Sequence, residues 1–278
     1  MAETVDLAEE AGFIEAELHY IVDDGKPSVR YVDWPEEAHK AHIPPYEKRR
    51  TRILNGRTAG ENFTLASHGF TFVTHETVVK EFFDEDEVLR VYYPEIEKLI
   101  KDQCGARRVV VFDHTVRTAD PSHHADRWIR NTVKSVHNDY TERSAPKRVR
   151  EILPADEAAV ALQRRFGITQ VWRAIQPRIE SEPLAMCDGK TIPEEGFIRN
   201  ERRYRDRTAE TYHISYNPAH RWYYFPLMTR NEALVFKVFD SDASAGVRFT
   251  AHTSFEDPNT APDAAPRESI EMRALVFY

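Results

Sequence analysis

The chain has 278 residues and a formal net charge of −8, with 41% hydrophobic and 11% aromatic residues. This acidic balance argues against a surface that follows nucleic-acid phosphates, and the apolar share is sufficient for a buried core. The two cysteines, Cys104 and Cys187, lie far apart, so neither a disulfide framework nor a thiolate zinc site is expected. Because the acidic N-terminal stretch reads as neither a secretory signal nor a membrane span, we expect a cytoplasmic protein without nucleic-acid or membrane partners.

The first part of the chain mixes short strands with helices. Apolar runs and helical spacing predict strands over 13–22, 70–73, 107–116 and 133–137, and helices over 77–83, 85–103, 144–150 and 155–166. Pro94 is expected to break or restart the second of these helices. The polar stretch 48–61 is expected to be a loop or hairpin, and the region 46–62 is a candidate lid over an active site.

The second part of the chain is rich in short strands. These are predicted over 168–175, 211–216, 222–226, 233–239, 247–252 and 268–277. Strands at this spacing without intervening helices favour an antiparallel sandwich or barrel. We therefore predict a mainly β fold with helices, a double-stranded β-helix (jelly roll), in one domain over 1–278. Residues 1–105 would support a core of about 106–278, with a helical insertion at about 141–166.

Two His-x-Asp tripeptides are candidates for metal binding. His124 and Asp126 lie in a polar stretch that reads as an exposed loop. His137 instead ends a predicted strand, and residues i and i+2 of a strand point to the same face. His137 and Asp139 could therefore bind one ion from one side.

A third ligand must come from elsewhere in the chain, and His252 at the end of a late strand is the best candidate. Two histidines and one carboxylate leave three open octahedral positions. This arrangement is typical of non-haem Fe(II) oxygenases, which bind a co-substrate and dioxygen at the same ion.

The last predicted strand carries candidates for binding an acidic co-substrate. If the connection 253–266 turns the chain back, the start of this strand lies beside His252. Arg267 could then bind the distal carboxylate of a keto-acid in a bidentate manner, and Ser269 could add a hydroxyl from the same face. Arg273 shares that face, but six residues place it roughly 20 Å away, too far for the same ligand.

Several motifs resemble those of a known family. The resemblance covers about residue 105 to the end and rests on Val111–Arg117, Val136–Thr141, Tyr216–Trp222, Phe236–Ser241 and Pro266–Glu271. Together these segments resemble the gibberellin desaturase and cephem 7-alpha-hydroxylase-like family of iron/2-oxoglutarate oxygenases of secondary metabolism.

The resemblance implies Fe(II) held by His137, Asp139 and His252. It also implies that Arg267, assisted by Ser269, binds 2-oxoglutarate as co-substrate with O2. Such an enzyme abstracts hydrogen from a C–H of a small natural-product substrate and releases succinate and CO2. The outcome would be hydroxylation, desaturation or oxidative cyclisation, and the sequence does not choose among them.

Substrate contacts and rival functions remain open at this point. Tyr140, Phe72, Arg117 and Arg173 are candidate substrate-binding residues, and the protein could be a monomer or a homodimer. One alternative is a metal-free jelly-roll module that binds small molecules. Another is a cupin-like metal hydrolase or isomerase, which would bind metal but ignore 2-oxoglutarate.

Overall fold

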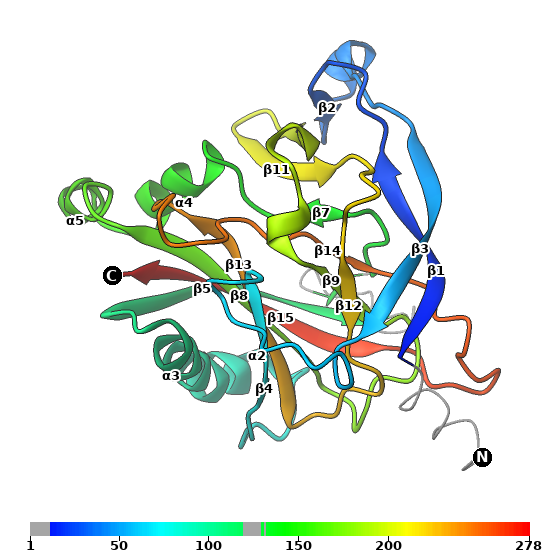
Figure 1. The fold of residues 1–278 in the computed structure, drawn as a ribbon. Coiled ribbons are helices and arrows are strands. Elements are labelled where there is room, and N and C mark those ends of the chain that lie inside the picture. The colour runs from blue at the N-terminus through cyan, green and yellow to red at the C-terminus, as the bar shows by residue number, and fades with distance from the viewer. Residues whose placement is uncertain (1–11, 119–128, 131) are drawn as a thin grey trace.

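Two β-sheets packed face to face form the body of the protein (Figure 1). The computed structural model describes residues 12–118, 129–130 and 132–278. The nine-stranded sheet has the order β1-β3-β12-β9-β14-β7-β11-β10-β2, and the six-stranded sheet has the order β4-β13-β8-β15-β5-β6. This architecture confirms the predicted mainly β fold.

The strands of the nine-stranded sheet are β1 (Phe13–Ile21), β2 (Ser28–Tyr31), β3 (Tyr46–Asn55), β7 (His137–Asn138), β9 (Leu184–Cys187), β10 (Phe197–Arg203), β11 (Thr208–Ile214), β12 (Trp222–Tyr224) and β14 (His252–Ser254). Those of the six-stranded sheet are β4 (Phe70–Thr74), β5 (Arg108–Thr118), β6 (Ile129–Arg130), β8 (Phe166–Ala174), β13 (Glu232–Asp240) and β15 (Glu268–Phe277). The last strand matches its predicted bounds.

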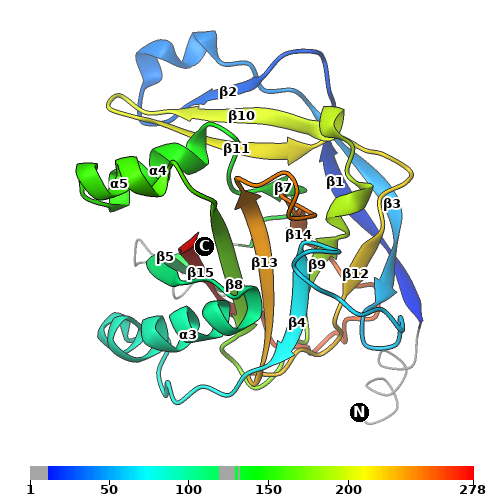
Figure 2. The ribbon, with the colours of Figure 1, turned by 60° about the vertical axis from the view of Figure 1, so that its left-hand side comes forward.

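Helices cover the outer face of the six-stranded sheet and one end of the sandwich. They are α2 (Glu85–Glu87), a π-helical turn (Val88–Tyr92), α3 (Tyr93–Cys104), α4 (Ser144–Ile152) and α5 (Ala155–Ala161). Short 3₁₀ turns occur at Pro35–Lys40, Gly189–Thr191 and Glu194–Gly196. Pro94 lies in the first turn of α3, where its missing N–H costs nothing, and Gly105 ends the helix in the left-handed conformation. Figure 2 shows α3 lying against the six-stranded sheet.

Alternation along the central strands separates the layers of the core. On β15, Leu275 faces the space between the sheets, whereas Met272 and Val276 pack toward the helical side. On β9, Met186 faces the same inner space and Cys187 the opposite layer. Because both faces of these strands are covered, burial alone does not reveal which side a given residue faces.

Four predictions about local structure are corrected. Residues 48–55 are not a loop, because they belong to β3, which pairs with β1, whereas 56–61 form the turn and irregular chain that follow it. The polar pattern of this segment arises because Lys48 and Arg50 form exposed cross-strand ion pairs with Glu17 and Glu15. The lid expected over 46–62 is therefore largely a sheet strand. The predicted helix 77–83 is absent, and the strand expected over 247–252 begins only at His252.

The relation of the last two strands also differs from the prediction. β14 pairs with β7 and β9, whereas β15 pairs with β5 and β8 in the other sheet. Arg267 and His252 therefore do not lie on neighbouring strands. They approach each other across the interior, because the connection between them crosses from one sheet to the other.

Candidate active site

Three predicted ligands meet between the two sheets. His137 opens β7, Asp139 directly follows it, and His252 opens β14. Their nitrogen and carboxylate ligand atoms all lie within 4.8 Å of one another. β14 and β7 pair so that His252 lies directly opposite His137, with ring centroids 4.4 Å apart. Because opposite residues of paired strands share a face, both imidazoles face the same space.

Both histidines are held neutral. Burial lowers the pKa of His137 and of His252 to about 4, so each ring keeps a lone pair at pH 7. The backbone carbonyl of Ser135 contacts Nδ1 of His137 at 2.8 Å, which leaves Nε2 at 3.5 Å from Oδ1 of Asp139. Nδ1 of His252 is buried and has no hydrogen-bond partner among the described residues. Neutral imidazoles beside a carboxylate form a donor set suited to a divalent metal.

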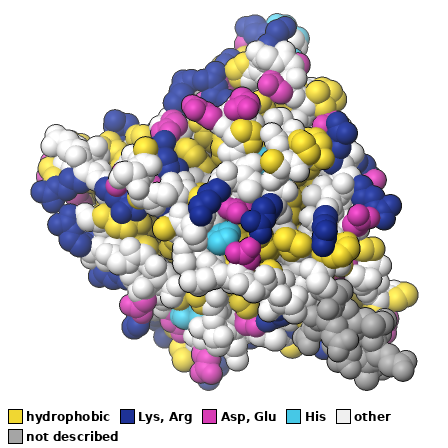
Figure 3. Space-filling model, viewed as in Figure 1, with side chains coloured by type: hydrophobic (Ala, Val, Ile, Leu, Met, Phe, Trp, Pro, Cys, Tyr) yellow, Lys and Arg dark blue, Asp and Glu magenta, His cyan; other side chains and the backbone are white. Residues whose placement is uncertain are grey.

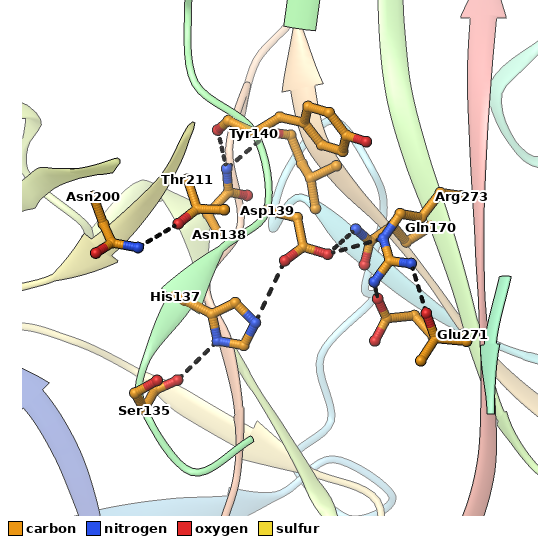
Figure 4. Close-up of polar contacts among 12 residues, drawn as sticks. Ser135, His137, Asn138, Asp139, Tyr140, Gln170, Asn200, Thr211, Glu271 and Arg273 are labelled. Carbon is orange, nitrogen blue, oxygen red and sulfur yellow. Dashed lines mark hydrogen bonds and ion pairs between the residues drawn. The ribbon is translucent and has the colours of Figure 1, made fainter. Parts of the chain in front are cut away.

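The second oxygen of Asp139 is held by the opposite sheet (Figure 4). Nε2 of Gln170 on β8 donates to Oδ2 at 2.6 Å, and Nε of Arg273 on β15 donates to it at 3.2 Å. Burial alone would raise the pKa of Asp139, but the guanidinium of Arg273, the two histidines and the Gln170 hydrogen bond hold it well below its usual range. Oδ1 is thus left as the oxygen directed at His137.

Arg273 is the centre of a buried charge network. It lies opposite Asp113 on β5 and Gln170 on β8, and its Nη1 contacts Asp113 at 3.2 Å. Its other Nη atom donates to Glu271, whose second oxygen lies 3.6 Å from Nε of Arg117. The sequence excluded Arg273 as a co-substrate anchor on distance, and the structure shows that it contacts the predicted metal ligand instead.

The sequence did not predict the residues that hold Asp139 in place: Gln170 and Arg273 contact it, and Glu271 contacts Arg273. Glu271 and Arg273 share the inner face of β15 with Ser269, so charged residues at every second position of a buried strand were an available signal. Gln170 gave no such signal. β8 is buried along its entire length, so its pattern does not distinguish the face that carries Gln170.

Arg267 lines a small pocket together with His252 and is 1% exposed. Its Nη1 donates to the carbonyl of Glu182 at 2.7 Å and to Oγ of Ser254 at 3.2 Å, and its guanidinium lies 5.6 Å from the ring of Trp172. Burial, together with the neighbouring Arg117, lowers the pKa of Arg267 to about 10, so it remains charged at pH 7.

Two polar atoms near this arginine are buried without a partner among the described residues. They are Nε of Arg267 and Oγ of Ser269. An unmatched buried charge and an unsatisfied hydroxyl are costly, and an anionic ligand would satisfy both. A pocket of about 10 Å³ lies next to Arg267, and Ser269 does not line it. Its lining residues are Arg117, Val133, His137, Trp172, Leu184, His252, Ser254, Arg267 and Glu271. Its donor set fits a keto-acid, and its side chains must move apart to admit one.

A second, larger cavity of about 500 Å³ opens on the other side of His137 and Asp139. Its walls come from β11, the β10–β11 hairpin, α4 and the residues before β7. The lining includes Asp113, Arg117, Ser135, Tyr140, Lys147, Arg148, Glu151, Arg202, Arg207, Ala209, Thr211, His213 and Arg273. A cavity of this size next to a candidate metal site could hold a small molecule.

The four predicted substrate contacts divide into two pairs. Tyr140 and Arg117 line the large cavity. Phe72 does not, because its ring stacks on Phe225 with centroids 4.1 Å apart. Arg173 faces the helical side of β8, where it donates to the carbonyl of His75 at 2.6 Å, so it does not reach the cavity either. The rival pair, His124 and Asp126, lies outside the described residues.

A two-histidine, one-carboxylate cluster inside a β-sandwich is the arrangement typical of non-haem Fe(II) oxygenases. Comparisons with known proteins agree with this class. Residues 18–277 match the family described as "YDMC: Oxidoreductase/YMDC permease-like domain". The hydroxylase/desaturase efuI of Hormonema carpetanum is 32% identical, over 93% of this chain and 92% of that protein. The alpha-ketoglutarate-dependent dioxygenase phiK of a fungal species (strain ATCC 74256) is 32% identical, over 97% and 98%.

A solved structure extends the similarity to the whole fold. The iron and alpha-ketoglutarate-dependent endoperoxidase NvfI superimposes with a TM-score of 0.86 at 26% identity, over 96% of this chain and 98% of that one. The chain belongs to the family of Fe(II)/2-oxoglutarate-dependent oxygenases that includes these hydroxylases and desaturases. The predicted jelly-roll core and the predicted family are thereby confirmed. Within the described residues, no helix is both long and apolar enough to cross a membrane.

Proposed function

We propose that His137, Asp139 and His252 bind Fe(II), that Arg267 and Ser269 bind 2-oxoglutarate, and that the enzyme oxidises a C–H bond of a small natural product. The observation that carries this proposal is the convergence of the three ligand atoms within 4.8 Å, from segments more than a hundred residues apart in the chain. When bound, iron with 2-oxoglutarate and dioxygen supplies an oxidant for aliphatic carbon, and the co-substrate leaves as succinate and CO2.

The protein's own contribution begins with the ligand geometry. The Ser135 carbonyl orients the His137 ring, and Gln170 with Arg273 occupies one oxygen of Asp139. Asp139 thus presents a single oxygen, which leaves coordination positions for a chelating co-substrate and for dioxygen. Such outer contacts typically change metal affinity or activity by about 10- to 100-fold.

The second contribution is placement of the co-substrate. The charge of Arg267, buried against carbonyl and hydroxyl oxygens, matches the distal carboxylate of 2-oxoglutarate, and the Ser269 hydroxyl adds a donor. Trp172 and Leu184 enclose this pocket and exclude water from it. The large cavity then positions the substrate, and this positioning decides between hydroxylation, desaturation and ring formation.

Anaerobic titration tests the proposal. Addition of Fe(II) and then 2-oxoglutarate should produce a visible metal-to-ligand charge-transfer band, which His137→Ala or Asp139→Ala should abolish. Succinate release with a panel of natural products would then identify the substrate. A metal-free binding module would show no band, and a hydrolase or isomerase would bind metal but ignore the keto-acid. Either result, or activity that survives Asp139→Ala, would refute the proposal.

A further inference from the structure

The large cavity contains more positive charge than its walls neutralise. Six cationic and four carboxylate side chains line it, in a chain whose net charge is −8. The outer face in Figure 3 has basic and acidic side chains intermixed. The excess of cations in the cavity therefore does not follow from the general composition of the surface.

Most of these cavity cations already have carboxylate partners. Arg273 contacts Asp139, Asp113 and Glu271, and Arg117 lies 3.6 Å from Glu271. The two cations of α4 share one acceptor. Nη1 of Arg148 lies 3.0 Å from Glu151, and Nζ of Lys147 lies 3.8 Å from it.

Arg202 and Arg207 are different. Neither forms an ion pair with a carboxylate within the described part of the chain. Arg207 lies over the ring of Tyr204, at 4.5 Å from its centroid. Arg202 lies opposite Ala209 on β11, so its side chain shares the face that carries Thr211 and lines the cavity with it.

A second arginine lies beside Arg202. β10 and β2 pair in parallel, and the register places Arg30 directly next to Arg202, although Arg30 itself does not line the cavity. Both side chains are exposed, so solvent weakens the repulsion between these like charges, and an anion bound between them would lower it further. Arg30 also forms no ion pair within the described residues, while Arg199 and Arg203 on β10 both contact Glu201. Arg202 on β10 and Arg30 on β2 are therefore the exceptions among the arginines of these two paired strands.

One face of β11 lines the cavity all the way from these arginines to the candidate metal site. Ala209, Thr211 and His213 follow one face of β11, and His213 lies opposite His137 on β7. The Tyr46 hydroxyl lies 2.6 Å from Nδ1 of His213. Burial, His137 and the charges of Arg202 and Arg30 lower the pKa of His213 to about 3, so this part of the wall is polar but neutral. The four residue steps from Ala209 to His213 along the strand correspond to about 13 Å.

We propose that the substrate of this cavity is an organic acid, with its carboxylate bound by Arg202 and Arg30. The carbon to be oxidised lies on the order of 10 Å away, beside His137 and Asp139. A carboxylate is ionised at pH 7, and paired guanidinium groups suit its two oxygens. This inference rests on the proposed function, since it names the substrate class of the same site.

Matched acid and amide pairs test the inference. The anaerobic enzyme with Fe(II) and saturating 2-oxoglutarate is titrated by calorimetry with benzoate, 4-phenylbutyrate and biphenyl-4-carboxylate, each compared with its primary amide. We expect at least one acid to bind about tenfold more tightly than its amide, an advantage that added NaCl reduces. Arg202→Gln should abolish this preference, Arg30→Gln should reduce it, and Arg202→Lys should retain part of it.

Arg205→Gln is the matched control. Arg205 lies on the same hairpin but binds Glu36 at 2.6 Å and does not line the cavity, so its replacement should leave the acid preference unchanged. Equal binding of acid and amide in every pair, or a preference that persists in Arg202→Gln, would overturn the inference. The charge-transfer band is recorded in the same samples. Its absence from the native enzyme would instead refute the proposed iron and 2-oxoglutarate sites.

Discussion

A small pocket and a large cavity lie beside the cluster of His137, Asp139 and His252. They differ in volume and in the groups that contact their arginine side chains. The pocket beside Arg267 measures about 10 Å³ and is closed by Trp172 and Leu184, whereas the cavity on the other side measures about 500 Å³. The pocket is formed by central strands of both sheets. Much of the cavity wall comes from α4 and the β10–β11 hairpin.

Under the proposed function, the small pocket beside Arg267 holds the co-substrate and the large cavity holds the substrate. A narrow pocket suits one co-substrate, whereas a large cavity can suit different substrates. Much of the cavity wall comes from α4, which lies outside the two sheets, and from β11 and the β10–β11 turn toward one edge of the nine-stranded sheet. Variants that change the pocket and leave the cavity unchanged test this division of roles.

The largest effect is expected from Arg267→Ala. Removal of one partner of a buried charged contact costs about 2–5 kcal/mol, so the affinity for 2-oxoglutarate should fall by about 30-fold or more. Titration of the charge-transfer band measures this. The control is Arg230→Ala, which removes a half-buried arginine that donates to the carbonyls of Ile175 and Val79. A change of less than threefold in Arg267→Ala would mean that the co-substrate binds elsewhere.

Arg273→Gln should act mainly on the metal. Loss of the guanidinium beside Asp139 is expected to weaken Fe(II) or Co(II) binding by up to about a hundredfold. Arg165→Gln is the comparison, because Arg165 also binds a buried carboxylate, that of Asp240, far from the site. Both variants should have a lower melting temperature, but only Arg273→Gln should lose metal affinity in a calorimetric titration. Equal metal affinities would make Arg273 a structural residue only.

Gln170→Leu should have a smaller effect of the same kind. It removes the 2.6 Å hydrogen bond to Asp139 but leaves the charge of Arg273 in place. We expect metal affinity to fall about tenfold, together with an altered absorption spectrum of the Co(II)-substituted protein. A native spectrum and native affinity would show that Arg273 alone holds this oxygen.

Trp172→Phe should give the smallest effect. The ring contacts the Arg267 guanidinium at 5.6 Å, and a weaker cation–π contact should lower 2-oxoglutarate affinity about threefold. The indole N–H of Trp172 has no partner in the described structure, so its loss removes no hydrogen bond. Trp222→Phe breaks the 2.8 Å bond to Tyr20 in the other layer and should lower stability without changing 2-oxoglutarate affinity. The reverse pattern would exclude Trp172 from the co-substrate pocket.

The sequence predicted the candidate ligands more securely than their surroundings. The two-residue spacing of His137 and Asp139 implied a common face, and the structure places their ligand atoms close together. Arg173 and Gln170 show the limit of such reasoning. They lie three residues apart on β8, on opposite faces of a strand that is buried throughout, so neither hydropathy nor spacing distinguishes the site-facing residue from the helix-facing one.

The amino-acid order by itself determined the donor types, the alternation that groups Ser269, Glu271 and Arg273 on one face, and the β-rich character of the second half. Only the tertiary structure decided that β14 and β15 belong to opposite sheets, and that Arg30 lies beside Arg202. These relations join segments far apart in the chain through strand register and sheet packing. Local periodicity carries no information about either, because it repeats identically whichever partner a strand acquires.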